Sequence, residues 1–464
     1  MQMSKHYDFV VIGGGSAGFN AARVASQYAE RVAVIDGAKD LGGLCILRGC
    51  MPSKTLIYAA EVQHLARHAD KFGLRVEARA PDMSAVRERK RAIIGDFAGF
   101  REKQLQDGKF DLLRAQARFV GPRELELSDG MRVTADRILI STGSSIAWPA
   151  VPGLKESMPW TSDHVLELDF VPESVIVLGG GVVACELAQY LARIGSRVVQ
   201  IQRSAHVLRG NSIDAADVVE RAFRDDGIQL ITHTKLIRVG FDGAEYEVIF
   251  EHEGIPRTRR ARHCLNALGR KPAIESLELD AAGIKTTSSG HIATDEFQQT
   301  SVPGVYAAGD CTGPHEIVHV AIQQAECATR HAFGKPVQPI DDSTLLKVIF
   351  TDPQVATVGR AQHDLDESKI PYLAASYPFD DHGKSILMEA KYGHVKVLAE
   401  PTSGRLLGAE IVGKDAGELI HVFSVAISAG LSAADMLKAP WYHPTLSEIV
   451  TYPLEEIAGK IAGG

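Results

Sequence analysis

The segment Tyr7–Asp36, YDFVVIGGGSAGFNAARVASQYAERVAVID, decides the fold. A β-branched run leads into a glycine cluster, an alanine-rich stretch and a second β-branched run, which is the pattern of a strand, a turn, a helix and a strand. The segment Ser174–Arg203, SVIVLGGGVVACELAQYLARIGSRVVQIQR, repeats this pattern. The two segments lie far apart in the chain, so they predict an α/β protein with two Rossmann-like, three-layer nucleotide-binding domains.

The first glycine cluster reads Gly13-x-Gly15-x-x-Gly18, with Ser16 inside it. The first glycine permits a tight turn, the second lets a pyrophosphate approach the backbone, and the third allows close packing of helix on strand. The helix N-terminus stabilises the phosphate charge. Asp36 ends the next strand, 23 positions after Gly13, where a carboxylate can hydrogen bond the ribose. Such turns also arise from packing alone, but strand, helix and acid together favour a dinucleotide site.

The second glycine cluster, residues 179–184, has alanine in the third place of the same pattern. The residue 23 positions after Gly179 is Gln202, so the ribose-binding acid is missing, and Arg203 and Arg209 lie nearby. A site with arginines and no carboxylate can accept a 2′-phosphate. We therefore expect NADP(H) rather than NAD(H), although ordinary surface arginines would give the same pattern. Two dinucleotide sites in one chain favour FAD and an exchangeable nicotinamide, with hydride passing between them.

Two cysteines, Cys45 and Cys50, lie five positions apart in the segment Gly42–Lys54, GGLCILRGCMPSK. A zinc site would need further ligands nearby, and six cysteines in 464 residues do not make a disulfide scaffold. Core packing remains an alternative for one of the two. Thiol–disulfide exchange is favoured, since it needs one accessible thiol and one resolving thiol. A helix that starts near Cys45 would lower the pKa of its thiol, and Lys54 adds positive charge one turn beyond Cys50.

The composition narrows the function further. A formal net charge of -8 disfavours a general nucleic-acid binder, which would usually be basic. No apolar run approaches the roughly 20 residues that cross a bilayer. The chain enters its first predicted strand without the pattern of a signal peptide. We therefore expect a cytoplasmic protein that binds neither nucleic acid nor membranes.

The segment Gly42–Lys54 resembles the redox-active segment of the FAD-dependent pyridine nucleotide–disulfide oxidoreductases of class I. This family includes dihydrolipoamide dehydrogenase, glutathione reductase and mercuric reductase. The resemblance extends over essentially the whole chain. Four further segments are similar to motifs of the family: Asn266–Pro272, the second FAD motif Thr300–Asp310, the start of the dimerisation domain Phe350–Gly359, and the C-terminal motif His443–Glu448.

The resemblance implies a role for each active-site residue. Cys45 would be the interchange thiol that attacks the substrate, and Cys50 would form the charge-transfer thiolate against the flavin. Lys54 would lie near flavin N5 and pair with Glu186, although a surface carboxylate is the alternative for Glu186. Asp310 would hold the ribityl chain of the flavin.

The resemblance also implies a homodimer with an active site shared across the interface. His443 of one subunit would serve as acid–base for the cysteines of the other. Glu448, five positions on, would orient and charge-stabilise the imidazole. A lone histidine is usually structural, but the His-Pro-Thr-x-x-Glu frame singles out this one among the 17 histidines. Pro444 is a candidate for a cis peptide bond.

The same resemblance predicts the domain order and the cofactor contacts. Residues 1–150 would bind FAD, 151–273 would bind NAD(P), 274–340 would complete the FAD site as a central domain, and 341–464 would form an α+β dimerisation domain. The residues expected to bind FAD are Gly13, Gly15, Ser16, Gly18, Asp36, Gly43, Lys54, Thr142, Gly143, Gly309 and Asp310. The other residues expected to contact a cofactor are Gly179, Gly181, Gln202, Arg203, Arg209 and Gly269. No metal is expected.

The substrate is the less determined part of the prediction. The Pro-Ser-Lys after Cys50 resembles dihydrolipoamide dehydrogenase or mercuric reductase, whereas Gln202 and the following arginines resemble the NADPH sites of glutathione and mercuric reductases. The sequence ends Lys460–Gly464 without the cysteine pair of mercuric reductase, which disfavours that enzyme. Leu44 and Leu47 replace a threonine and an asparagine that the family usually has, so the substrate pocket departs from the pattern.

We therefore predict electron transfer between NAD(P)(H), FAD, the Cys45–Cys50 disulfide and an external dithiol or disulfide. The favoured substrate is dihydrolipoamide, free or on a lipoyl domain. The alternatives are an NADPH-dependent reductase of a low-molecular-weight disulfide and a mercuric-reductase-like enzyme. A flavoprotein subunit for redox sensing and a nicotinamide transhydrogenase are alternatives of other classes.

Overall fold

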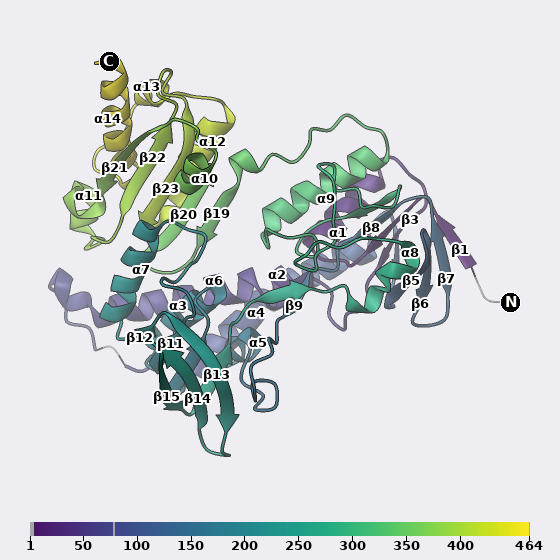
Figure 1. Ribbon diagram of the computed structural model, residues 1–464, viewed down its shortest axis with the longest axis horizontal. Helices are drawn as coiled ribbons and strands as arrows, with labels where there is room; N and C mark the ends of the chain where they lie inside the picture. The colour runs from purple at the N-terminus through teal and green to yellow at the C-terminus, as the bar shows by residue number, and fades with distance from the viewer. Residues whose placement is uncertain (1–3, 78, 464) are drawn as a thin grey trace. The chain divides into compact units, whose positions relative to one another are not determined.

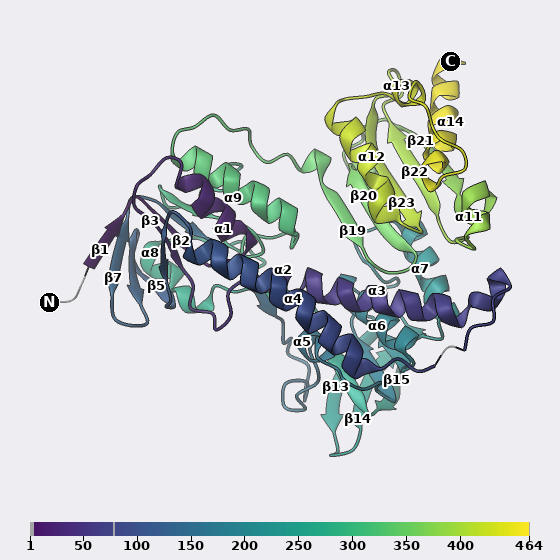
Figure 2. The ribbon, with the colours of Figure 1, turned by 180° about the vertical axis from the view of Figure 1, so that it is seen from behind.

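The computed structural model describes residues 4–77 and 79–463, which divide into two compact units. The boundary between the units falls within two long helices, α3 (Cys50–Arg67) and α4 (Met83–Gln106). The first unit comprises the described residues of Met1–Thr55, Ala85–Ala147 and Gly269–Ile340, and the second comprises those of Leu56–Ser84, Trp148–Leu268 and Asp341–Gly464. Figure 1 and Figure 2 show the elements of both units.

The first unit is built on a parallel five-stranded sheet of order β18-β8-β2-β3-β4. Its strands are β2 (Phe9–Ile12), β3 (Val32–Ile35), β4 (Asp111–Leu113), β8 (Ile138–Ile140) and β18 (Val305–Ala307). The central strands β2 and β3 are fully buried, as expected for β-branched runs covered on both faces. The strand β2 pairs with β3 through Phe9 and Val32, and with β8 through Val10 and Ile138.

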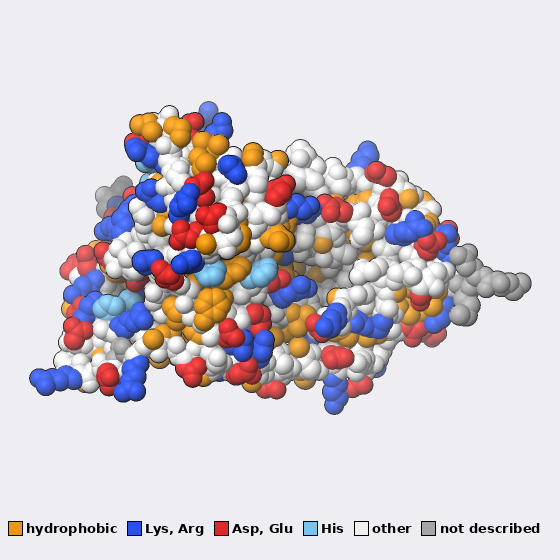
Figure 3. Space-filling model, turned by 90° about the horizontal axis from the view of Figure 1, so that it is seen from below, with side chains coloured by type: hydrophobic (Ala, Val, Ile, Leu, Met, Phe, Trp, Pro, Cys, Tyr) orange, Lys and Arg blue, Asp and Glu red, His pale blue; other side chains and the backbone are white. Residues whose placement is uncertain are grey.

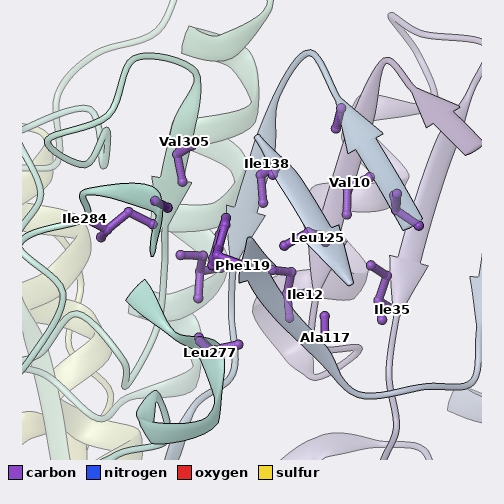
Figure 4. Packing of buried hydrophobic residues seen from close by; sticks show 14 of the residues in the cluster. Val10, Ile12, Ile35, Ala117, Phe119, Leu125, Ile138, Leu277, Ile284 and Val305 are labelled. Carbon is purple, nitrogen blue, oxygen red and sulfur yellow. The ribbon is translucent and has the colours of Figure 1, made fainter. Parts of the chain in front are cut away.

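Side chains of β2 alternate between the two faces of this sheet. Phe9 and Val11 pack into a core with α1 (Ser16–Ala25) and α9 (Val318–Ala332), which lie side by side in both ribbon views. Val10 and Ile12 point to the opposite core, shared with a second sheet of order β1-β7-β6-β5 (Figure 4). The second sheet and its neighbours are β1 (Ser4–Tyr7), β5 (Ala117–Gly121), β6 (Glu124–Leu127), β7 (Arg132–Ala135), η2 (Glu275–Leu277) and α8 (Leu279–Ala282).

The second unit contains the other parallel sheet, of order β12-β11-β10-β16. Ile176 and Leu178 on β10 pack against an antiparallel sheet that includes Val248 and Phe250. The elements of this part are α5 (Ser162–Leu166), β10 (Ser174–Leu178), α6 (Val182–Ile194), β11 (Arg197–Ile201), α7 (Ile213–Asp225), β12 (Gln229–Ile231), β13 (Thr234–Phe241), β14 (Tyr246–His252), β15 (Ile255–Ala261) and β16 (His263–Asn266).

The C-terminal part of the second unit is an antiparallel sheet of order β19-β20-β23-β22-β21 with helices packed on it. The helix α12 contacts β20 and β23, and α14 contacts β21 and β22. The elements are β19 (Leu346–Ile349), β20 (Gln354–Gly359), α10 (Gln362–Glu367), β21 (Leu373–Pro378), α11 (Gly383–Leu387), β22 (His394–Ala399), β23 (Leu406–Gly413), α12 (Ala416–Ser428), α13 (Ala433–Leu437) and α14 (Thr451–Ala462).

The predicted fold class is confirmed: two Rossmann-like parallel sheets are followed by a C-terminal α+β part. The four linear domain ranges stay a prediction. Acidic and basic side chains are interspersed on the face seen in Figure 3. Within residues 4–77 and 79–463, no helix combines the length and the hydropathy required to span a membrane.

Candidate functional site

The first glycine cluster forms the tight turn between β2 and α1. Gly13 has φ +100°, and a Cβ there would lie 2.5 Å from the carbonyl oxygen of Ser141. A Cβ at Gly18 would lie 1.8 Å from the oxygen of Gly13, so the first turn of α1 packs directly on the end of β2. Gly15 is the N-cap residue of α1, which begins at Ser16. The turn of glycines 13–15 thereby places no side chain in front of the N-terminus of α1, which lets a pyrophosphate approach the backbone.

Asp36 follows β3 and faces the same turn. Its carboxylate accepts hydrogen bonds from the backbone N–H groups of Gly14 and Ala38, each at 2.8 Å. Arg114 donates to the backbone carbonyl of Asp36 at 2.9 Å. The acid predicted to contact a ribose is therefore fixed beside the glycine turn.

A cavity of about 390 Å3 connects the glycine turn to the cysteines within the first unit. The hydroxyl oxygen of Thr142 is buried and has no hydrogen-bond partner among the described residues. Gly43 has φ +73° and a Cβ there would lie 2.6 Å from the Cα of Gly15, so this wall also requires glycine. The predicted residues in the lining are Gly13, Gly15, Ser16, Asp36, Gly43, Cys45, Cys50, Thr142, Gly143, Gly309 and Asp310. An orphaned hydroxyl and a wall of glycines fit an elongated dinucleotide such as FAD.

Asp310 is held at the cavity by residues from distant parts of the sequence. The hydroxyl of Ser144 donates to Asp310 Oδ2 at 2.6 Å, and Arg270 donates to the hydroxyl and to the carbonyl of Ser144, each at 2.8 Å. Glu316 lines the same cavity. Burial, and then the negative charge of Asp310, raise the pKa of Glu316. No motif in the sequence indicates Glu316, which reaches the cavity only through the fold.

The two cysteines belong to two different helices. Cys45 is half-buried inside the short helix α2 (Gly43–Leu47), and Cys50 is the first residue of α3. The hydrogen bond with Cys50, then burial and the charge of Cys50, raise the pKa of Cys45, while Lys54 opposes the shift. The expectation of a lowered pKa at Cys45 is therefore wrong, because the hydrogen bond with Cys50 and burial outweigh the charge of Lys54. The remaining four cysteines are buried.

The second glycine cluster repeats the turn in the second unit. Gly179 has φ +119°, and a Cβ there would lie 2.4 Å from the oxygen of Ala267. Gly181 is the N-cap residue of α6, and a Cβ there would meet no described atom within 4 Å. The backbone at the start of α6 is therefore open to a ligand. Gly269, also predicted as a cofactor contact, lies in the first unit with φ +115°.

Gln202 occupies the place of the missing ribose acid. It is buried, accepts a hydrogen bond from its neighbour Arg203 N–H at 2.9 Å, and donates to the carbonyl of His206 at 3.3 Å. The side chains of Arg203 and Arg209 are exposed. The loop is fixed further by Glu220, which accepts a hydrogen bond from the N–H of Val207 at 3.1 Å.

Lys54 and Glu186 belong to different units. Glu186 is buried on α6 and accepts a hydrogen bond from the backbone N–H of Phe350 at 3.0 Å. The pairing of Lys54 with Glu186 stays a prediction.

The structure brings together the C-terminal pair that the resemblance implies. Nδ1 of His443 lies 2.9 Å from one carboxylate oxygen of Glu448 and 3.0 Å from the other. The hydrogen bond from His443 lowers the pKa of Glu448. The side chain of His443 is 74% exposed, whereas that of Glu448 is 18% exposed. The imidazole therefore lies at the surface and is hydrogen bonded to a more buried carboxylate. The peptide bond between His443 and Pro444 is cis.

Comparison with known proteins assigns the family. A family model described as pyridine nucleotide-disulphide oxidoreductase matches residues 7–332, and the model of its dimerisation domain matches residues 346–453. The chain belongs to this family. It is therefore an oxidoreductase and a flavoprotein, and the cofactors of its family are FAD and NAD(P)H. The matched dimerisation domain supports a homodimer.

Relatives with two different activities match the chain about equally well. The mercuric reductase of Bacillus cereus is 33% identical over 443 residues, which cover 95% of this chain and 70% of that protein. The dihydrolipoyl dehydrogenase of Bacillus subtilis is 32% identical over 447 residues, which cover 94% and 96%. The structure of LpdA from Mycobacterium tuberculosis matches with a TM-score of 0.87 and 27% identity, covering 97% of this chain and 99% of that one. Family membership alone therefore does not identify the substrate.

Proposed function

We propose that the chain exchanges electrons between NAD(P)(H), FAD, the Cys45–Cys50 pair and an external dithiol, with dihydrolipoamide as the favoured substrate. The observation that carries the proposal is the contact between the two thiols inside the cavity that Asp36 and Asp310 also line. FAD, when bound, supplies a two-electron acceptor next to these thiols.

Cys45, Cys50 and His443 have different roles in the proposed thiol–disulfide exchange. A thiolate of the dihydrolipoyl dithiol attacks the Cys45–Cys50 disulfide at Cys45, which releases Cys50 as a thiolate. The second substrate sulfur then displaces Cys45, so the substrate becomes a disulfide and the enzyme a dithiol. Two protons leave the substrate, and we assign their transfer to His443 of the partner subunit. Cys50 begins α3 with Lys54 one turn further on, and both features favour a thiolate there.

The proposal includes the remaining roles and the domain order. Lys54 and Glu186 form an ion pair beside the flavin, and Glu448 orients His443. Residues 1–150 bind FAD, 151–273 bind the nicotinamide, 274–340 complete the FAD site and 341–464 form the interface of a homodimer. The resemblance of the Pro-Ser-Lys after Cys50 to dihydrolipoamide dehydrogenase supports the lipoyl substrate, as does the relative of that name.

A second candidate is the NADPH-dependent reduction of a low-molecular-weight disulfide. It is favoured by Gln202, which replaces the ribose acid, and by the exposed side chains of Arg203 and Arg209. In this reaction NADPH is oxidised and the Cys45–Cys50 disulfide is reduced. The resulting dithiol of the enzyme then reduces the external disulfide.

An anaerobic absorption spectrum separates the two candidates. The purified yellow protein is titrated with dihydrolipoamide and, in a second sample, with NADPH. A long-wavelength thiolate-to-flavin band with dihydrolipoamide supports the lipoyl substrate. A band with NADPH alone keeps the disulfide mechanism and supports the second candidate. If neither reductant gives a band, Cys45 and Cys50 are not the redox centre and the proposal fails.

A further inference from the structure

His206, Asp217 and Glu220 form a cluster of possible metal ligands that the proposed mechanism does not use. Nδ1 of His206 lies 3.4 Å from a carboxylate oxygen of Asp217 and 3.5 Å from one of Glu220. The three ligand atoms all lie within 4.8 Å of one another. His206 belongs to the loop after β11, and the two acids lie on α7 at a spacing that puts both on one face of the helix. All three residues belong to the second unit.

The ring nitrogen of His206 has no partner that accounts for its burial. Nδ1 is buried and makes no hydrogen bond in the part of the chain that the structure describes. A charged hydrogen bond to either carboxylate would be about 2.7–2.9 Å long, which is shorter than both observed distances. Two ligands of a tetrahedral zinc ion, in contrast, lie roughly 3.3–3.6 Å apart, because each is bound at about 2.0–2.2 Å. The observed spacing therefore fits the ligands of a cation better than a hydrogen-bonded ion pair.

The carboxylate of Glu220 is held so that one oxygen remains able to bind a cation. The side chain is buried, and Oε2 accepts a hydrogen bond from Arg224 at 3.1 Å. Oε1, the oxygen that faces His206, accepts one from the N–H of Val207 at 3.1 Å and retains a second lone pair. Outer hydrogen bonds of this kind orient a carboxylate ligand. Asp217 is exposed, so its side chain can turn towards the same point.

We propose that His206, Asp217 and Glu220 bind one divalent transition-metal ion such as Zn²⁺. An imidazole with two carboxylates is a ligand set that Zn²⁺ accepts, and three protein ligands leave a further position for water. The ion joins the loop after β11 to α7 where the carbonyl of His206 accepts a hydrogen bond from Gln202 at 3.3 Å. This departs from the expectation of no metal, because only the fold turns the loop back onto α7. The inference depends neither on the proposed substrate nor on the redox role of the cysteines.

Equilibrium dialysis with Zn²⁺ tests the site in the FAD-loaded protein. The protein is first treated with a chelator and with N-ethylmaleimide, so that accessible thiols do not bind zinc. We expect one Zn²⁺ per chain with a dissociation constant below about 100 μM. His206→Gln and Asp217→Asn should each raise that constant at least about tenfold, since even an outer contact to a metal ligand contributes on that scale. Because Asp217 is exposed, Asp217→Asn tests the site even if His206→Gln does not fold.

His363→Gln is the matched control, because Nε2 of His363 also lies beside a carboxylate, that of Asp364, at 3.0 Å. It should leave the dissociation constant unchanged. Zn²⁺ should also raise the melting temperature of the unmodified protein more than that of Asp217→Asn, since the ion binds the folded chain.

Equal binding in all variants, or binding weaker than about 100 μM in the unmodified protein, overturns the inference and leaves His206 as a charge partner of the two acids. Equally strong binding of Mg²⁺ at the same site also overturns it, because Mg²⁺ prefers oxygen ligands and the imidazole would then not be a ligand. The dialysis involves no turnover, so a failure of the proposed function is seen separately in the spectra.

Discussion

His443 and Glu448 form a hydrogen-bonded pair in which Nδ1 of the ring lies 2.9 Å from the carboxylate. The bond places the proton of the neutral ring on Nδ1 and leaves Nε2 free to accept a proton. Glu448 therefore fixes the orientation of the His443 ring, which is 74% exposed to solvent. This geometry is suited to an acid–base group that acts on a molecule arriving from outside.

Replacing His443 by glutamine should lower dithiol turnover by about 100-fold or more, because proton transfer by a positioned side chain contributes on that scale. The FAD content and the reduction of a dye by NADPH should not change, since neither needs the thiols. Glu448→Gln should cause a smaller loss, on the order of tenfold. The measurement is steady-state turnover with dihydrolipoamide and with the dye.

His421→Gln is the matched control, because His421 is an exposed histidine on α12. Unchanged dithiol turnover in His443→Gln would contradict the acid–base role. Retention of a redox response together with low turnover in the unmodified protein would favour a sensing subunit instead.

Gly18→Ala should destabilise the first unit and remove FAD. The added Cβ would lie 1.8 Å from the oxygen of Gly13, so either α1 or the end of β2 must move. We expect a loss of about 3 kcal/mol in the free energy of unfolding and a low ratio of flavin to protein absorbance. Gly99→Ala on α4 is the control, because a Cβ there meets no described atom within 4 Å. That change should stabilise the helix by about 0.5–1 kcal/mol; equal effects of the two changes would argue against the close packing of the turn.

Gln202→Glu should shift the nicotinamide preference towards NADH. A carboxylate at this place can bind the ribose hydroxyls and repel a 2′-phosphate. We expect roughly a tenfold change in the ratio of kcat/KM for NADPH and NADH. The new side chain cannot donate to the carbonyl of His206, now 3.3 Å from Nε2, which should cost about 1 kcal/mol of stability.

Gln229→Glu, at an exposed position of β12, makes the same chemical change elsewhere in the second unit and should leave the preference unaltered. Arg203→Ala and Arg209→Ala should raise KM for NADPH and not for NADH. If NADH is already the better cofactor of the unmodified protein, the predicted NADP(H) site is wrong.

The two parallel sheets could be predicted because their signals are local. A glycine turn between β-branched runs requires a strand and a helix in direct sequence, and Gly13 and Gly179 both adopt the positive φ that such a turn demands. The pair of His443 and Glu448 is local as well. Each of these predictions depends on residues within about one supersecondary unit.

The supports of the site could not be predicted, because they join distant segments. Ser144 and Arg270 are 126 positions apart and meet only where β9 (Ser144–Ile146) pairs with β17 (Arg270–Pro272). Arg101 is one of several arginines on α4, and only the fold places its guanidinium over the ring of Phe19. The direction of the Cys45 pKa shift depends on a hydrogen bond with Cys50 and on burial, and a sequence pattern contains neither.

His64 makes the stability of the second unit depend on pH, and the direction of this dependence follows from its surroundings. It lies on α3 with Nδ1 3.5 Å from Asp226, which in turn accepts a hydrogen bond from Arg193 at 3.0 Å. Burial, and then the charge of Arg193, lower the pKa of His64 to about 4, and they outweigh the opposing charge of Asp226. Arg193 also donates to Asp352 at 2.8 Å, so the cation is fixed on both sides.

The unfolded chain binds a proton at His64 more readily than the folded chain, because an unperturbed histidine has a pKa of about 6.5. The stability due to neutral His64 is therefore fully present above that pH and is lost as the pH falls towards 4. Between pH 7.5 and pH 5 the linkage amounts to about 2 kcal/mol. Asp352 does not contribute to this window: burial raises its pKa, but the charge of Arg193 outweighs burial and lowers it below the ordinary value.

His64→Gln should therefore remove about 2 kcal/mol of the stability change that urea unfolding of the unmodified protein shows between pH 7.5 and pH 5. His363→Gln, at a 55% exposed position, should leave that change intact. The comparison uses the difference between the two pH values within each variant, so a general loss of packing at position 64 cancels. An identical pH dependence in His64→Gln and the unmodified protein would contradict the lowered pKa: it would show that the folded and unfolded chains bind the proton at His64 equally well, so that the charge of Asp226 offsets burial and Arg193.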